Sequence, residues 1–293
     1  MIYKNPILEN GADPFVMLDG GKYYYYATRL PDGYDVSVSD DLVHWENKGI
    51  CLHKEDVCGE KGFWAPEIIK HNGKYYMAFT ADQHLGIAVA DSPLGPFRQH
   101  SNGFLFEERR IDGHFFRDDD GSIYLFYVDC NCGNRIFGAR LNETLTEVIP
   151  GSERLLLAAE EGWEISRPPC DCVEGPFVLK HNGRYYLTYS ANGFSHIEYA
   201  VGVAFADSPL GPYKKYAKNP ILARNEHVNG TGHHSFTTAK DGKQLICVYH
   251  IHYSLERILP RHTCIDKAAF VYDEDLGFDT LKIFGPTVEE IEL

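Results

Sequence analysis

Three carboxylic acids stand at comparable points of the chain: Asp13, Asp112 and Glu174, each followed directly by proline or glycine. If a concave site brings them together, their mutual repulsion raises the pKa of at least one of them. One carboxyl group is then protonated near neutral pH while another is ionised, which is the pairing that cleavage of a glycosidic bond requires. For one such residue alone, a turn-capping role would be the simpler interpretation.

Glu67 and His233 occupy similar places in two further segments. Each of the five residues precedes a glycine expected in a turn, by 8 residues for Asp13, 6 for Glu67 and 9 for Asp112, Glu174 and His233. The spacing is nearly constant, so we expect most of these side chains to converge on one funnel. Carboxylates at four matched places make simple turn capping a weak explanation of the pattern.

These residues open five copies of a strand-rich repeat. The clearest copies combine residues 71–76 with 91–97 and residues 181–186 with 207–213. The turn glycines stand at positions 21, 73, 121, 183 and 242, and intervals near 50 residues are typical of radial or stacked repeats. Each unit has room for about four short alternating strands, which is the content of one propeller blade.

We therefore predict an all-β fold, a five-bladed β-propeller in which residues 1–293 form a single domain. A two-sheet β-sandwich also explains short strands, but not the near-copied Asp-Ser-Pro-Leu-Gly-Pro segments. Residues 152–161 are the best candidate for a helix. Residues 282–284, or residues 2–8, are expected to supply a strand that closes the last blade.

Composition narrows the classes of partner. Aromatic residues make up 13% of the 293 residues, which suits both pleated strands and the binding of sugar rings. The net charge is −14 and no Lys/Arg cluster follows a phosphate backbone, so nucleic acid is not an expected partner. The sequence contains no run of 18 apolar residues, which a membrane span would need, and its N-terminus has no apolar leader. We therefore expect a cytoplasmic protein.

Two Cys-x-Cys pairs, Cys130 with Cys132 and Cys170 with Cys172, could together offer four thiolates to a zinc ion. Paired ligands of structural zinc are usually separated by two to four residues, and here one residue separates them. We therefore expect reduced thiols near strand ends.

Four segments, taken in order, resemble glycoside hydrolase family 43. They are Ala-Asp-Pro-Phe-Val at 12–16, Trp-Ala-Pro-Glu at 64–67, Ile-Asp-Gly-His-Phe-Phe at 111–116 and Val-Glu-Gly-Pro at 173–176. The resemblance runs through nearly the whole chain. It implies a five-bladed propeller that cleaves arabinose- or xylose-containing oligosaccharides with inversion. Invertase-type propellers usually open with Asn-Asp-Pro-Asn-Gly, which this chain lacks, so cleavage of fructans is not expected.

The resemblance also implies roles for single residues. Asp13 would be the general base, Glu174 the general acid, and Asp112 the residue that orients the acid and tunes its pKa. Gly113 departs from the proline that the family often has, which leaves the Asp112 backbone less constrained. The remaining expected site residues are sugar-binding Trp64, Glu67, Arg261 and His233, of which His233 would also support a calcium or other ion in the central channel. The alternatives are propeller core for Trp64 and a surface salt bridge for Arg261, and no organic cofactor is expected.

The sequence favours an exo-acting α-L-arabinofuranosidase. A β-D-xylosidase and an endo-arabinanase of the same family are alternatives, and the latter needs an open groove. From another class, a sugar-binding propeller without activity would be expected to lack at least one of the three carboxylates. A scaffold for protein partners would have no reason to keep them at matched places.

Overall fold

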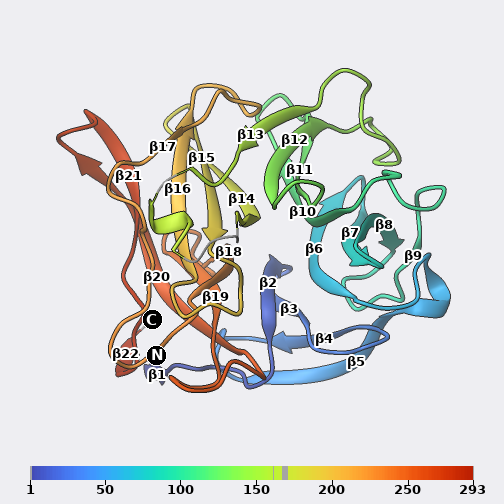
Figure 1. Cartoon of the computed structure of the whole chain (residues 1–293). Coiled ribbons are helices and arrows are strands. Elements are labelled where there is room, and N and C mark those ends of the chain that lie inside the picture. The colour runs from blue at the N-terminus through green and yellow to red at the C-terminus, as the bar shows by residue number, and fades with distance from the viewer. Residues whose placement is uncertain (1, 161, 167–170, 293) are drawn as a thin grey trace.

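The computed structural model describes residues 2–160, 162–166 and 171–292, and it confirms the predicted all-β, five-bladed propeller. Figure 1 shows five sheets arranged around a central axis, with the two ends of the chain close together at the rim. Each sheet contains four antiparallel strands that are consecutive in sequence. Each strand pairs with the next one in the sequence, so each blade is a meander that starts at the axis and runs outward.

The blades begin where the repeat predicted. Blade 1 consists of β2 (Ala12–Asp19), β3 (Lys22–Thr28), β4 (Gly33–Ser39) and β5 (Trp45–His53), and blade 2 of β6 (Trp64–His71), β7 (Lys74–Ala81), β8 (His84–Ala90) and β9 (Arg98–Gln99). Blade 3 consists of β10 (Arg110–Arg117), β11 (Ile123–Asp129), β12 (Arg135–Arg140) and β13 (Arg154–Leu157), and blade 4 of β14 (Val173–His181), β15 (Arg184–Ala191), β16 (Ala200–Ala206) and β17 (Lys214–Lys215). Blade 5 consists of β18 (Gly232–Thr238), β19 (Leu245–Ile251), β20 (His262–Asp273) and β21 (Phe278–Ile283).

The elements outside the blades are short. Two 3-10 turns, η1 (Lys54–Asp56) and η2 (Gly162–Glu164), follow blade strands β5 and β13. The terminal strands β1 (Ile2–Lys4) and β22 (Glu290–Glu292) pair with each other in a separate two-stranded sheet. Within the three described ranges, no helix has the length and apolar character needed to span a membrane.

Tyrosine side chains fill much of the space between the blades. Tyr25, Tyr26, Tyr34 and Tyr127 are completely buried. Their rings provide large apolar surfaces, and the hydroxyl groups reach acceptors on neighbouring segments. The Tyr34 hydroxyl, for example, donates to the carbonyl oxygen of Trp64 at 2.9 Å and so joins blade 1 to blade 2. The high aromatic content of the sequence is therefore explained by packing between blades.

Each innermost strand contains a β-bulge near its first residue. The residue in the bulge has a positive φ in every blade, and these residues are Asp13 (+50°), Ala65 (+45°), Asp112 (+57°), Gly175 (+55°) and His233 (+42°). Proline follows the bulge residue in blades 1, 2 and 4, where its missing N–H removes no ladder hydrogen bond. A non-glycine residue with positive φ is uncommon, so the fold holds three active-site candidates in a costly backbone conformation.

The bulges correct the sequence alignment of the blade entrances. The structural counterpart of Asp13 in blade 2 is Ala65, two residues before Glu67, and in blade 4 it is Gly175, one residue after Glu174. Only Asp13, Asp112 and His233 are true counterparts. A bulge changes the side-chain alternation along a strand, so counting back from the turn glycine could not give this register.

One secondary-structure prediction was wrong. The segment predicted as a helix at residues 152–161 contains strand β13, which pairs with β12 at the outer edge of blade 3. The expectation that residues 282–284 complete the last blade is confirmed in part, because residues 282 and 283 belong to β21, the outer strand of blade 5. Residues 2–4, from the alternative segment, pair with β22 outside the blades.

The seam between blade 5 and blade 1 is closed by backbone and side-chain hydrogen bonds, and the Gly11 amide donates to the carbonyl oxygen of Arg261 at 2.8 Å. The Ser235 hydroxyl donates to the carbonyl oxygen of Pro14 at 2.8 Å, and the Tyr23 hydroxyl donates to that of Thr238 at 3.1 Å. The Asn5 amide further donates to the carbonyl oxygen of Ile265 at 2.8 Å. These contacts bring Asp13 of blade 1 next to the residues of blade 5.

Candidate active site

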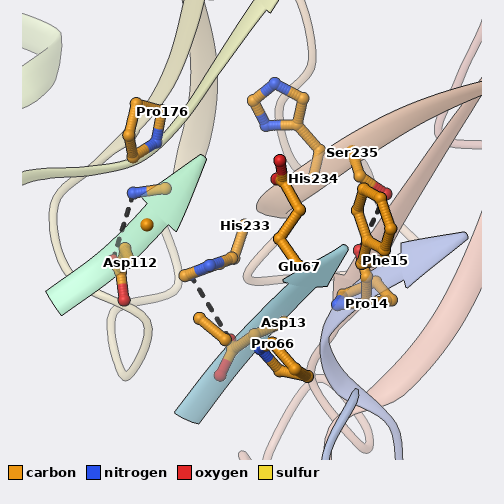
Figure 2. A pocket seen from close by; sticks show the side chains of 13 residues that line it. Asp13, Pro14, Phe15, Pro66, Glu67, Asp112, Pro176, His233, His234 and Ser235 are labelled. Carbon is orange, nitrogen blue, oxygen red and sulfur yellow. Dashed lines mark hydrogen bonds and ion pairs between the residues drawn. The ribbon is translucent and has the colours of Figure 1, made fainter. Parts of the chain in front are cut away.

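One cavity of about 420 Å³ receives all three predicted catalytic carboxylates. Its walls come from all five blades and from the loops between them, and its lining residues are Asp13, Trp64, Gln83, Arg109, Ile111, Asp112, Cys130, Asn134, Glu174, Phe194, His233 and Arg261. A much smaller space of about 20 Å³ shares Asp13, Asp112 and His233 with it and extends along the channel. Figure 2 shows this smaller space, with Asp13, Asp112 and His233 contributed by separate strands.

Asp13 is a buried carboxylate beside one guanidinium group and two imidazole rings. Arg261 Nη1 donates to its Oδ1 at 2.7 Å, and His233 Nδ1 and His250 Nδ1 each lie 3.4 Å from the same oxygen. Burial opposes ionisation, but Arg261 and the two histidines outweigh it and hold the pKa of Asp13 well below its usual range. Asp13 is therefore ionised at any working pH, as a general base must be.

Asp112 has the opposite environment. Its carboxylate is buried, and burial together with the negative charges of Glu174 and Asp13 raises its pKa to about 7, while His233 opposes the rise. Its Oδ2 accepts a hydrogen bond from the amide of Gly175 at 3.2 Å. The residue after Glu174 thus ties the Asp112 carboxylate to the strand that carries Glu174.

Glu174 is held at both carboxylate oxygens. The Tyr199 hydroxyl donates to its Oε1 at 2.8 Å and the Asn134 amide donates to its Oε2 at 3.0 Å. The side chain is buried next to the cavity, and Glu174 is the second residue of β14. This double support fixes the direction of the carboxyl group, which a proton donor to a leaving group needs.

Trp64 and Arg261 both lie on the cavity wall, as predicted for sugar-binding residues. The Trp64 side chain is 37% exposed, and Gly62 beneath it leaves room for the indole ring. The Arg261 guanidinium lies 4.4 Å from the ring centre of Phe194. Its Nε is buried and has no hydrogen-bond partner within the described residues.

Glu67 does not line the large cavity. Its Oε1 accepts from the amide of Phe115 at 2.8 Å, and its Oε2 lies 2.9 Å from Nδ1 of the buried His114. Figure 2 shows the Glu67 side chain pointing away from Asp13 and Asp112. In this geometry Glu67 joins blade 2 to blade 3 in the channel, and its predicted contact with a sugar stays a prediction.

His233 lines both the cavity and the channel space. Asp13, Asp112 and Glu174 raise its pKa although burial opposes this. Across the described part of the chain, no three His, Cys, Asp or Glu residues are grouped so that they could share one metal ion. Calcium takes about six to eight oxygen ligands, so His233 could hold such an ion only through water molecules.

The sequence analysis missed several residues that hold or line the site, namely His250, Tyr199, Asn134, Arg109 and Phe194. His250 had a detectable signal. It follows the turn glycine of its blade by eight residues, and Thr28, Thr80 and Ser190 follow theirs by seven. The other four lie on loops or strand ends outside the repeat, where spacing carries no information.

Cys130 and Cys172, one from each Cys-x-Cys pair, lie at strand ends, as expected. Cys130 directly follows β11 and lines the cavity, and Cys172 directly precedes β14. Burial, with the charges of Asp112 and Glu174, raises the pKa of Cys130 to about 12. Cys170 lies outside the described residues.

The site can therefore perform acid–base chemistry on a ligand of sugar size. Asp13 is kept ionised by Arg261, whereas the pKa of Asp112 is raised beside Glu174 in the same cavity. Carboxyl groups with such different environments are the arrangement that glycosidic cleavage uses.

Comparison with protein families gives one match that covers most of the chain. A family model described as Glycosyl hydrolases family 43 matches residues 3–275. The match includes every residue of the cavity.

Three relatives with known names differ in the sugar that they act on. A β-D-galactofuranosidase, xynD, from Aspergillus niger is 30% identical over 91% of this chain and 82% of the relative. A β-xylosidase from Xylanibacter ruminicola is 26% identical over 78% of this chain and 84% of the relative. An extracellular exo-α-(1→5)-L-arabinofuranosidase from Streptomyces chartreusis is 29% identical over 85% of this chain and 82% of the relative.

Solved structures agree with the fold. The crystal structure of an endo-1,4-β-xylanase from Bacteroides thetaiotaomicron superimposes with a TM-score of 0.89 at 35% identity, over 98% of both chains. The similarity thus includes the whole propeller.

Proposed function

The chain belongs to glycosyl hydrolases family 43, and from that membership we propose that it is an inverting, exo-acting α-L-arabinofuranosidase. The observation that carries the proposal is the single cavity that receives Asp13, Asp112 and Glu174. A non-catalytic sugar-binding propeller has no need of an ionised carboxylate and a carboxyl group of raised pKa in one cavity.

In the proposed mechanism, Asp13 accepts a proton from a water molecule as that water attacks the anomeric carbon. Glu174 gives a proton to the departing glycosidic oxygen on the opposite face of the sugar. Asp112 orients Glu174 through the Gly175 amide. An inverting pair needs room for the water, so we expect the Asp13 and Glu174 carboxyl groups to stand about 6.5–9.5 Å apart.

Two cavity residues are proposed to bind the sugar. The exposed face of Trp64 provides a flat apolar wall, and the Arg261 guanidinium on the cavity wall offers a donor to a sugar hydroxyl. Arg261 thus has two roles in the proposal, because its Nη1 also holds Asp13.

The names of two relatives favour a furanoside over a pyranoside as the substrate. α-L-Arabinofuranose and β-D-galactofuranose share the same ring configuration and differ by one exocyclic hydroxymethyl group. The relatives with these names are 29% and 30% identical to this chain. One pocket shape suits both sugars, so we propose a furanose-binding site.

The second candidate is a β-D-xylosidase, supported by the β-xylosidase relative at 26% identity. An endo-arabinanase remains the third. A chain-cleaving enzyme would release internal fragments from a polymer, while an exo-acting one releases single sugars, so the products of linear arabinan distinguish them.

The deciding experiment compares nitrophenyl α-L-arabinofuranoside with nitrophenyl β-D-xyloside and arabinotriose, for the wild type and Glu174→Ala. We expect wild-type activity on the arabinofuranoside and a loss of at least about 10³-fold on arabinotriose in the variant. Glu147→Ala, which removes an exposed carboxylate far from the cavity, is the control. Equal activity of Glu174→Ala and wild type on arabinotriose would remove Glu174 from the mechanism, and sugar binding without hydrolysis would favour the binding propeller.

We propose in addition that His233 supports a hydrated ion in the central channel. If His233 supports a hydrated ion through water ligands, elemental analysis of the dialysed protein should find about one equivalent of metal, reduced in His233→Ala. Wild-type protein free of metal, with full activity in the presence of a chelator, would contradict this.

A further inference from the structure

The five bulges are joined by a ring of hydrogen bonds between blades. In four of them, the amide of the bulge residue donates to a side chain at the end of the second strand of the preceding blade. The four pairs are Ala65 to Thr28 Oγ1 (2.8 Å), Asp112 to Thr80 Oγ1 (3.2 Å), His233 to Ser190 Oγ (2.8 Å) and Asp13 to His250 Nδ1 (3.2 Å). Each acceptor satisfies a buried amide that the bulge removes from the strand ladder.

The fifth position of the ring is different. By strand register, the residue equivalent to Thr28, Thr80 and Ser190 in blade 3 is Val128, which pairs with Ile111 as Thr80 pairs with Trp64. Val128 is completely buried and carries no acceptor. The Gly175 amide donates instead to Oδ2 of Asp112, at 3.2 Å.

We propose that Val128 is a positioning residue for the catalytic acid. Because it offers no acceptor, the Gly175 amide binds the Asp112 carboxylate, and this bond fixes Asp112 against the strand that carries Glu174. The inference rests on the proposed roles of Asp112 and Glu174, and it adds the residue that makes their arrangement possible.

The physical effect of this bond is on the ionisation of Asp112. An amide donor favours the ionised form of a carboxylate, so the bond from Gly175 opposes the rise in the pKa of Asp112 that burial and the neighbouring carboxylates cause. The other charged groups near Asp112 are Asp13 of β2, Glu174 of β14 and His233 of β18. Within the described residues, Asp112 accepts a hydrogen bond from a backbone amide, whereas the donors to Glu174 are the side chains of Asn134 and Tyr199.

The test is Val128→Thr, which restores the hydroxyl that the other blades have, at nearly the same volume. The new Oγ1 competes for the Gly175 amide and releases Asp112. We expect kcat on arabinotriose to fall about tenfold, the usual effect of losing a hydrogen bond to a charged group, while KM changes little. Val203→Thr makes the same chemical change at a buried position of β16 and should leave kcat unchanged.

A readout independent of activity is the amide signal of Gly175 in NMR spectra of glycine-labelled protein. In the wild type this amide should shift as pH passes through about 7, because its acceptor, Asp112, titrates there. The shift should disappear in Asp112→Asn and be reduced in Val128→Thr. A wild-type Gly175 amide that does not respond between pH 5 and 9 overturns the proposal even if Val128→Thr fails to fold.

The two levels of failure are distinguishable. If the amide behaves as expected but no glycoside is hydrolysed, the proposed function is wrong and the positioning bond stands. If glycosides are hydrolysed and Val128→Thr keeps the wild-type kcat and amide titration, the role of Val128 is wrong and the proposed function stands.

Discussion

The carboxyl groups of the cavity differ because of the side chains around them. Asp13 has Arg261 at 2.7 Å and two histidines nearby, whereas Asp112 has a single amide donor and faces two carboxylates. Residue type and spacing predicted that these acids would meet. Which of them would be ionised depended on Arg261 and His250, which lie more than 200 residues from Asp13 in sequence.

Arg261→Gln should move the acidic limb of the pH profile. Removal of the guanidinium withdraws the strongest support for the ionised form of Asp13, so the pKa of Asp13 rises and the base becomes protonated at milder acidity. We expect kcat/KM to fall as pH decreases from a higher starting pH than in the wild type, with the alkaline limb unchanged. The measurement is kcat/KM from pH 3 to 9, and an acidic limb at the wild-type position would contradict the role of Arg261.

Asp112→Asn should affect substrates according to their leaving groups. If Asp112 supports proton donation by Glu174, hydrolysis of arabinotriose, whose leaving group needs a proton, should slow by about 10²-fold or more. Hydrolysis of a dinitrophenyl glycoside, whose leaving group needs none, should slow far less. Equal losses on both substrates would show that Asp112 acts in binding or in folding.

At the scale of single elements, the bulge determines which residues reach the cavity. Strand starts were predictable because each blade repeats a hairpin turn at a nearly fixed spacing. The bulge was not, since one extra residue leaves the strand pattern on both sides intact. Proline after Asp13, Ala65 and Gly175 was the available signal, because proline in an inner strand is tolerated at a bulge.

Strand β13 shows the other limit of local sequence. The segment Arg-Leu-Leu-Leu-Ala-Ala-Glu-Glu has high helix propensity. Its residues Arg154–Leu157 nevertheless form the outer strand of blade 3, where β12 offers an open edge. Pairing with a neighbouring strand outweighs a propensity of a few tenths of a kcal/mol per residue.

Gly175→Ala tests the bulge in blade 4. Gly175 has φ +55° and a new Cβ would stand 3.3 Å from Cγ of His233, so the variant combines backbone strain with a tight contact in the site. Gly183→Ala introduces alanine at φ +78° in a turn with open space around it and is the matched control. Both should lose about 1 kcal/mol of unfolding free energy, and only Gly175→Ala should lose kcat. Equal kcat in the two variants would show that the bulge tolerates displacement.

At the scale of the whole molecule, one buried acid helps to hold the ends of the chain to blade 5. Asp266 Oδ2 accepts from the Tyr249 hydroxyl at 2.6 Å and from the Thr287 amide at 3.2 Å. The Thr287 side chain contacts both Asp266 and the amide of Asn5. Burial raises the pKa of Asp266 to about 6, although these donors oppose the rise.

Stability should therefore fall as pH rises through about 6. The pKa of Asp266 is higher in the folded protein than in the unfolded chain, so its contribution is complete below pH 3.8 and is lost by about pH 6. Asp266→Asn removes this dependence, which amounts to about 3 kcal/mol at most. The check is the difference in unfolding free energy between wild type and variant from pH 4 to 8. A constant difference would contradict the prediction, while Asp112 adds a residual slope of the same sign to both proteins.

Blade 5 and blade 1 are not consecutive in the chain, so their joint is held by noncovalent contacts, which include the backbone bond from Gly11 to Arg261. Asp13 stands on one side of that joint and Arg261, His233 and His250 stand on the other. In a urea titration, partial separation of the two blades would disconnect Asp13 before the remaining blades melt. Catalysis should then disappear at a lower urea concentration than the circular dichroism signal, so the rate of turnover reports whether blade 5 and blade 1 remain in contact.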